Sequence, residues 1–222
     1  MSSPIALKKK SFVHKAFVNL HQLLSHKRRV SILSEKISEL IKNEFPDIEV
    51  IRCVDVGCGD MQIAENIGMH NPKTAWNCID IHNLPENASD RWDKYNKFDG
   101  INIPYDDKSM DVVLFCDVLH HDQDNAPHLL RDAGRVGRRI IVKDHFEYSF
   151  YSRLMLRLMD IIGNWGYGIK IPERYFTIQS FKEVCLSSGL TVIRVEIDID
   201  LYPKLLRFIL RPKWQFIAVL ES

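Results

Sequence analysis

Apolar side chains follow a helical period in the first part of the chain and a strand-like pattern after residue 49. Residues 11–24 repeat their apolar positions every three or four residues, which predicts a helix. A second helix is predicted where Ile32, Leu33 and Ile37 fall on one face. Short runs rich in β-branched residues then predict strands at 49–57, 74–81, 110–118, 138–145, 191–199 and 214–221.

Helical patterns alternate with these strands. They predict helices at 61–69, 125–136, 148–162 and 177–189. The last of these has a start signal at Thr177 and a stop signal at Gly189. Apolar strands that alternate with helices are typical of a mostly parallel sheet covered on both faces. The pattern therefore predicts an α/β fold, in which ligands bind beyond the carboxyl ends of the strands.

The composition restricts the class of protein. A chain of 222 residues with 45% hydrophobic residues is predicted to form a single domain over 1–222. Its net charge of +1 argues against a nucleic-acid partner. None of the five cysteines has CxxC spacing, so no metal site is predicted. Unpaired cysteines inside apolar runs favour a cytoplasmic location.

The segment VDVGCGD, residues 54–60, carries the first chemical signal. Gly57 and Gly59 follow a predicted strand and lead into a predicted helix, which suits close approach of a ligand to the backbone. Asp80 ends the next strand 21 residues after Gly59, close to the spacing of an acid that binds a ribose. Both NAD and S-adenosylmethionine fit this arrangement.

Two residues of the turn favour S-adenosylmethionine. A dinucleotide site requires a third glycine at the sixth motif position, where this chain has Gln62. Asp60 would repel a pyrophosphate but attract the cationic groups of S-adenosylmethionine. An NAD-type oxidoreductase is therefore the weaker alternative among enzymes.

Three segments together resemble the class I S-adenosylmethionine-dependent methyltransferases, in the branch that includes quinone-biosynthesis enzymes. They are VDVGCGD, IDIH and FDGINIPYDDKSMDVVLFCDVLHH, and the resemblance extends from about Val50 to His145. It implies a seven-stranded, mostly parallel Rossmann-like sheet with helices on both faces. It also implies an N-terminal helical cap over 1–46 and a helical lid insertion over 146–176.

The resemblance also implies which residues bind the cofactor. The motif positions that match are Asp55, Gly57, Gly59, Asp80, Asp99, Gly100, Cys116 and Asp117. Asp80 corresponds to the ribose-binding acid, and Asp99 with Gly100 to the pair that holds the adenine. Arg29, in a basic pair before the second helix pattern, is either a partner of the cofactor carboxylate or part of a solvated face. The chain departs from the family at Met61, where a third glycine is usual.

Candidate catalytic residues follow the fourth and fifth predicted strands. His121 and His145 are candidate bases, because a histidine near its usual pKa accepts a proton at neutral pH. Asp144 and His145 end the fifth predicted strand, and an Asp–His pair at the strand ends could orient and activate a nucleophile. The alternative is that the histidines only hold their loops by packing and hydrogen bonding. Asp111, at the start of the fourth strand, is predicted to be a solvated turn residue.

Aromatic residues concentrate between 146 and 176, where eight of the chain's 22 aromatics occur. This enrichment favours an apolar or aromatic small-molecule acceptor beneath a lid that includes the glycine-rich stretch 164–168. The alternative is a packed helix without ligand contact.

The two basic and apolar segments, 8–29 and 202–214, leave a different class of function open. Such segments bind the surface of anionic membranes, or they pack against the domain. A non-catalytic, membrane-associated module that binds a cofactor is therefore the alternative to a cytoplasmic methyltransferase. No apolar run reaches the ~18 residues of a membrane span.

Overall fold

The computed structural model describes residues 27–82, 93–163 and 170–222. Its strands are β1 (Ile51–Val56), β2 (Thr74–Asp80), β3 (Tyr95–Lys97), β4 (Met110–Cys116), β5 (Gly137–His145), β6 (Thr191–Ile197) and β7 (Gln215–Glu221). Its α-helices are α2 (Lys27–Glu44), α3 (Gln62–His70), α4 (Ala126–Val136), α5 (Phe150–Gly163) and α6 (Ile178–Ser187). Short 3-10 turns are η3 (Leu119–Asp122), η4 (Lys204–Leu206) and η5 (Pro212–Trp214).

The strands form one seven-stranded sheet in the order β3-β2-β1-β4-β5-β7-β6. The first five of these strands are parallel, whereas β7 is antiparallel to both β5 and β6. The predicted mostly parallel α/β sheet is therefore confirmed. The strand order reverses between β1 and β4, because the chain continues from β1 to β2 on one side and from β4 to β5 on the other. In such folds ligands bind at the carboxyl ends of the two strands at this switch point.

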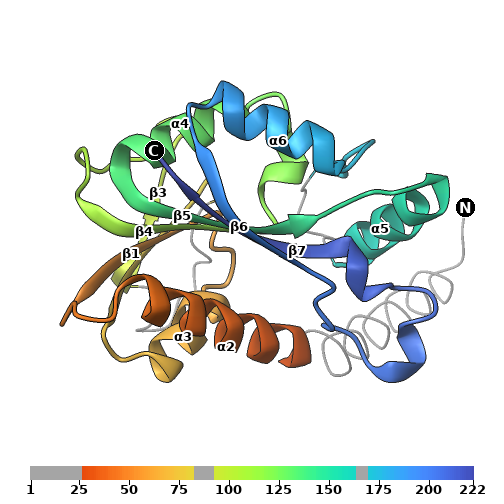
Figure 1. Cartoon of the computed structure of the whole chain (residues 1–222), viewed down its shortest axis with the longest axis horizontal. Coiled ribbons are helices and arrows are strands. Elements are labelled where there is room, and N and C mark those ends of the chain that lie inside the picture. Colours follow the sequence, from red (N-terminus) through yellow and green to blue (C-terminus); the bar gives the residue numbers. More distant parts are fainter. Residues whose placement is uncertain (1–26, 83–92, 164–169) are drawn as a thin grey trace, which may run out of the picture.

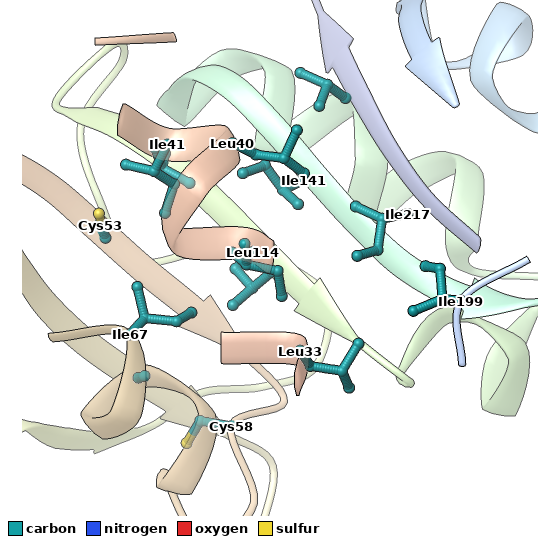
Figure 2. Close-up of a cluster of buried hydrophobic side chains, with 14 of the residues drawn as sticks. Leu33, Leu40, Ile41, Cys53, Cys58, Ile67, Leu114, Ile141, Ile199 and Ile217 are labelled. Carbon is teal, nitrogen blue, oxygen red and sulfur yellow. The ribbon is translucent and has the colours of Figure 1, made fainter. Parts of the chain in front are cut away.

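Two hydrophobic clusters hold helices against the two faces of the sheet (Figure 1). On one face α2 and α3 pack on β1 and β4, and Figure 2 shows Leu33 and Ile67 of these helices close to Leu114 of β4. On the other face α4 and α6 contribute Leu130 and Phe181 to the second cluster. The central strands are buried from both sides, which explains their nearly continuous apolar sequence.

Each predicted strand, and each predicted helix from residue 61 on, agrees with a described element to within two residues at each end, whereas α2 extends beyond the predicted residues at both ends. Strand β3 was not predicted, and the predicted helix 11–24 lies outside the described residues. Asp111 is not a solvated turn residue, because it is 2% exposed and accepts a 2.8 Å hydrogen bond from the backbone N–H of Arg52. No helix in the described part of the chain is long and apolar enough to cross a membrane.

Candidate active site

The turn after β1 is shaped by two glycines with positive φ. Gly57 has φ 75°, and a Cβ there would lie 2.6 Å from a methyl group of Val118, so a larger residue would clash. Gly59 has φ 54°, and a Cβ there would meet no atom within 4 Å. The backbone at Gly59 therefore faces open space, which allows a ligand to approach it closely.

Asp80 lies against this turn as the sequence predicts. One of its carboxylate oxygens accepts a 2.9 Å hydrogen bond from the N–H of Gly59, and the other accepts a 3.0 Å bond from the N–H of His82. Asp80 is 6% exposed, so these bonds hold a nearly buried carboxylate at the carboxyl end of β2. Each oxygen retains a lone pair that can accept a ligand hydroxyl.

Asp55 is the least satisfied acid of the turn. It is 1% exposed, and its Oδ1 atom has no hydrogen-bond partner among the described residues. Burial, followed by the nearby carboxylates of Asp80 and Asp60, raises the pKa of Asp55 to about 7. A buried acid of this kind favours a cationic or hydrogen-bonding ligand beside it.

Met61 occupies the position of the third glycine in the family that the sequence resembles. Its φ of 63° is in the left-handed region that favours glycine, although its side chain is 2% exposed and belongs to the core. Burial of the thioether side chain offsets the backbone strain, which costs on the order of 1 kcal/mol. The glycine geometry of the turn is thus kept without the glycine.

Asp99 and Gly100 lie beyond β3. The Oδ1 atom of Asp99 accepts 2.7 Å bonds from the N–H groups of Ile101 and Asn102, and these bonds lower the pKa of this exposed acid. Gly100 has φ 81°, and its carbonyl accepts a bond from Asn125. The side chain of Asp99 thus supports its own loop, and its contact with an adenine stays a prediction.

A buried ion cluster follows β4. Asp117, with φ 59°, accepts bonds from Arg29 of α2 and Lys143 of β5. Lys143 is fully buried, and its pKa is lowered to about 7 by burial and by the charge of Arg29. Arg29 thus reaches the predicted site, where its partner is Asp117. Cys116, which precedes Asp117, is half-buried, and burial raises the pKa of its thiol.

His120, which was not among the predicted site residues, is the centre of a second network. Its Nδ1 atom lies 2.7 Å from Oδ1 of Asp144, and its Nε2 atom lies 3.4 Å from Oδ2 of Asp160 on α5. Tyr175 donates its hydroxyl hydrogen to Asp160. Burial alone would lower the pKa of His120, but the carboxylates of Asp144 and Asp160 outweigh it and raise the pKa to about 9. His120 is therefore a buried imidazolium at neutral pH.

Asp144 serves this network. Its two oxygens accept the Nδ1–H of His120, the backbone N–H of His120 and the backbone N–H of His145. With three donors on one carboxylate, Asp144 orients the loop after β4 and the end of β5. The imidazole closest to Asp144 is thus that of His120, at 2.7 Å, whereas the Nδ1 atom of the predicted base His145 lies 3.4 Å from the same carboxylate.

The two predicted bases, His121 and His145, lie beside His120. The ring centroid of His120 is 4.1 Å from that of His121 and 5.3 Å from that of His145. Burial and the charge of His120 lower the pKa of His121 to about 4. Burial and the charge of Lys143 lower the pKa of His145 to about 3. Both imidazoles are therefore neutral at neutral pH.

Two sets of side chains have the composition of a metal site: Asp117, His120, Asp144 and His145, and His120, His121 and Asp160. Within each set the ligand atoms lie within 4.8 Å of one another. Asp117 is already neutralised by Arg29 and Lys143, and both Asp144 and Asp160 pair with His120. These groups thus form an internally compensated network, and we assign no metal to it.

Sequence reasoning missed Lys143 and Asp160, and it noted His120 only as the neighbour of His121 and Tyr175 only as one of the aromatic residues of 146–176. His120 adjoins a predicted base, so the paired histidines carried a signal for it. Asp160 carried none, because it occurs inside a helical pattern and only the packing of α5 brings it to the strand ends. Of the aromatics assigned to a lid, Phe146, Tyr175 and Phe176 are buried in the core, while Trp165 and Tyr167 lie outside the described residues.

Comparisons with known proteins agree with this fold. The sequence profile of a family described as "Methyltransferase domain" matches residues 24–195. A search of curated proteins finds no match. Among solved structures, a methyltransferase from Aquifex aeolicus described as S-adenosylmethionine-dependent has a TM-score of 0.53 and 16% identity. The alignment covers 82% of this chain and 88% of that one.

Two further structures have the same fold. The mitomycin 7-O-methyltransferase MmcR has a TM-score of 0.60 and 16% identity, over 87% of this chain and 54% of its own. The CurJ carbon methyltransferase has a TM-score of 0.57 and 18% identity, over 85% of this chain and 54% of its own. This chain thus spans about half the length of either protein.

Proposed function

This chain belongs to the methyltransferase domain family, and we propose that it methylates an oxygen or carbon atom of a small apolar or aromatic acceptor. Its cofactor is S-adenosylmethionine, which supplies an electrophilic methyl group when bound. The observation that carries the proposal is the position of His121 after β4 and of His145 at the end of β5, on the two strands that follow β1 and its glycine turn in the sheet.

The residues of the turn fit this cofactor. The open backbone at Gly59 and the free lone pairs of Asp80 suit a ribose with two hydroxyl groups. The buried Oδ1 atom of Asp55 lacks a partner among the described residues, and a cationic ligand would compensate the charge of this acid. We assign Asp55, Gly57, Gly59 and Asp80 to the cofactor site on this basis.

His121 is the better candidate for a base. Its Nδ1 atom lies 3.0 Å from the carbonyl oxygen of Lys170, and a carbonyl can only accept. Nδ1 therefore carries the hydrogen, and Nε2 has the lone pair that takes a proton. His121 is half-buried, whereas His145 is 7% exposed and its Nδ1 atom lies 3.4 Å from both Asp117 and Asp144.

The low pKa of His121 restricts the acceptor. A base with a pKa of about 4 is unprotonated at neutral pH but binds a proton weakly. It suits an acceptor with an acidic proton, such as a phenol or an activated C–H group, better than an aliphatic alcohol.

The test compares His121→Ala with the parent enzyme and with His128→Ala, which removes an exposed histidine of α4. Removal of a general base costs about 10²–10⁴ in rate, while calorimetry should show unchanged binding of S-adenosylhomocysteine. Products are identified by the mass gain of one methylene group in a set of phenols, enols and alcohols. Parent-like turnover by His121→Ala with a phenol would exclude His121 as the base.

We place this reaction in the cytoplasm, because all five cysteines are free and four of them are buried. A non-catalytic module that binds the cofactor is the competing function. It predicts binding of S-adenosylhomocysteine without turnover of any acceptor in the host's metabolite extract.

A further inference from the structure

Helix α5 is apolar on both of its sides. Leu156 is buried in the core, whereas Phe150, Leu154 and Leu158 are 74%, 49% and 46% exposed. These three residues are spaced four apart and form one stripe along the outer face of the helix. Arg157 is exposed on the same helix, so the outer surface of α5 presents a basic side chain as well as apolar ones.

The loop between β6 and β7 continues this surface. Leu205 is 87% exposed and Phe208 is 84% exposed, the two most exposed large apolar side chains in the described part of the chain. The loop lies against α5, because the rings of Tyr151 and Trp214 are 5.9 Å apart. Figure 1 shows α5 and this loop, in blue, at the same end of the sheet.

Basic side chains are interleaved with the apolar ones. Residues 203–214 contain four exposed basic residues and no acid. They are Lys204, Arg207, Arg211 and Lys213. Arg207 pairs with Asp200, and the Nζ atom of Lys213 lies 5.4 Å above the ring of Tyr148. We call the stripe on α5 together with residues 203–214 the apolar–basic surface.

We infer that the apolar–basic surface docks on an anionic membrane. Lysine and arginine side chains reach the level of the lipid headgroups, while Leu205 and Phe208 are exposed enough to enter the acyl region. The absence of acids in 203–214 matches the negative charge of such a surface. A folded protein partner more commonly meets an apolar patch that is depleted of lysine and has its charges at the rim.

Docking on this side brings lipid close to the proposed active site. The inner side of α5 carries Asp160, which pairs with His120 and Tyr175 at the strand ends. One helix thus separates the apolar–basic surface from the network beside the predicted bases. This consequence rests on the proposed function, and it identifies the acceptor as a molecule that dissolves in the membrane.

Vesicle sedimentation of the full chain tests the inference without any measurement of activity. The vesicles contain phosphatidylcholine, with or without phosphatidylserine, at low and high salt. Two double variants perturb the surface: Leu205→Ser with Phe208→Ser, and Lys204→Glu with Arg211→Glu. The matched controls are Leu186→Ser, which changes an 80% exposed leucine, and Lys182→Glu, both on α6 at the opposite face of the sheet.

The parent and both controls should sediment with anionic vesicles at low salt. Each of the two reversed basic residues should weaken binding by about fivefold or more, and loss of the two apolar side chains should weaken it by more than about tenfold. The inference is wrong if the parent stays in the supernatant, or if the α6 controls weaken binding equally. It is also wrong if sedimentation velocity shows a dimer that the Leu205→Ser and Phe208→Ser changes dissociate.

Discussion

The buried imidazolium of His120 makes the stability of the protein depend on pH in a defined direction. Its pKa is about 9 in the folded protein and about 6.5 in an unfolded chain. A raised pKa stabilises the folded state fully below pH 6.5, and the stabilisation is lost as the pH rises through about 9. The difference corresponds to about 3 kcal/mol.

His120→Gln removes this charge and leaves Asp144 and Asp160 without their cation. The free energy of unfolding is measured by guanidinium denaturation from pH 6 to pH 9.5, for the parent and for the variant. The parent's advantage should be largest at pH 6 and decrease by about 3 kcal/mol toward the alkaline end. His128→Gln, at an exposed position, is the matched control.

The difference between the two proteins is the quantity of interest, because Lys143 also titrates in this range. Its pKa is lowered to about 7, which makes stability rise with pH and opposes the effect of His120. An advantage that does not change with pH would show that His120 is neutral in the folded protein, and would refute the ion network.

Two further predictions concern the cofactor site. Asp80→Ala should lower the affinity for S-adenosylmethionine by about 30- to 1,000-fold, since two hydrogen bonds to a charged acceptor are lost; calorimetry that gives the parent's dissociation constant would remove Asp80 from the site. The pKa of Asp55 is raised to about 7 in the folded protein, so ionisation of this acid destabilises the fold as the pH rises from 4 through 7. Asp55→Asn removes this ionisation and should stabilise the cofactor-free protein by up to about 4 kcal/mol at pH 8. The same variant should bind the cofactor more weakly, and denaturation should show a gain at pH 5 that is less than half of the gain at pH 8.

Local signals in the sequence were sufficient for most of the helices and strands. Thr177 forms the capping box with Ser180 that starts α6, and Gly189 has the φ of 75° that its stop signal requires. These contacts lie within a few residues of one another, so they depend little on the rest of the fold. Strand β3 has three residues, too short to show a period, and it exists because β2 offers it a free edge.

The sequence also determined that Gly59, Asp80, Asp117 and His145 would lie together. Each follows or ends a strand of the parallel part of the sheet, and the carboxyl ends of parallel strands share one edge. The glycine spacing and the acid 21 residues later are local features of the chain that fit NAD as well as S-adenosylmethionine, and Asp60 and Gln62 favour S-adenosylmethionine. This inference needs only the order of the elements.

The partners of the charged side chains were decided by tertiary structure alone. Asp160 reaches His120 because α5 packs across the strand ends, and Lys143 reaches Asp117 because β4 and β5 are neighbours in register. Whether a histidine is an imidazolium or a neutral base depends on such distant carboxylates and on burial. Neither the positions of these carboxylates nor the burial of the ring is a property of the local sequence. The pKa values of the adjacent residues His120 and His121 therefore differ for a reason that lies in the tertiary structure.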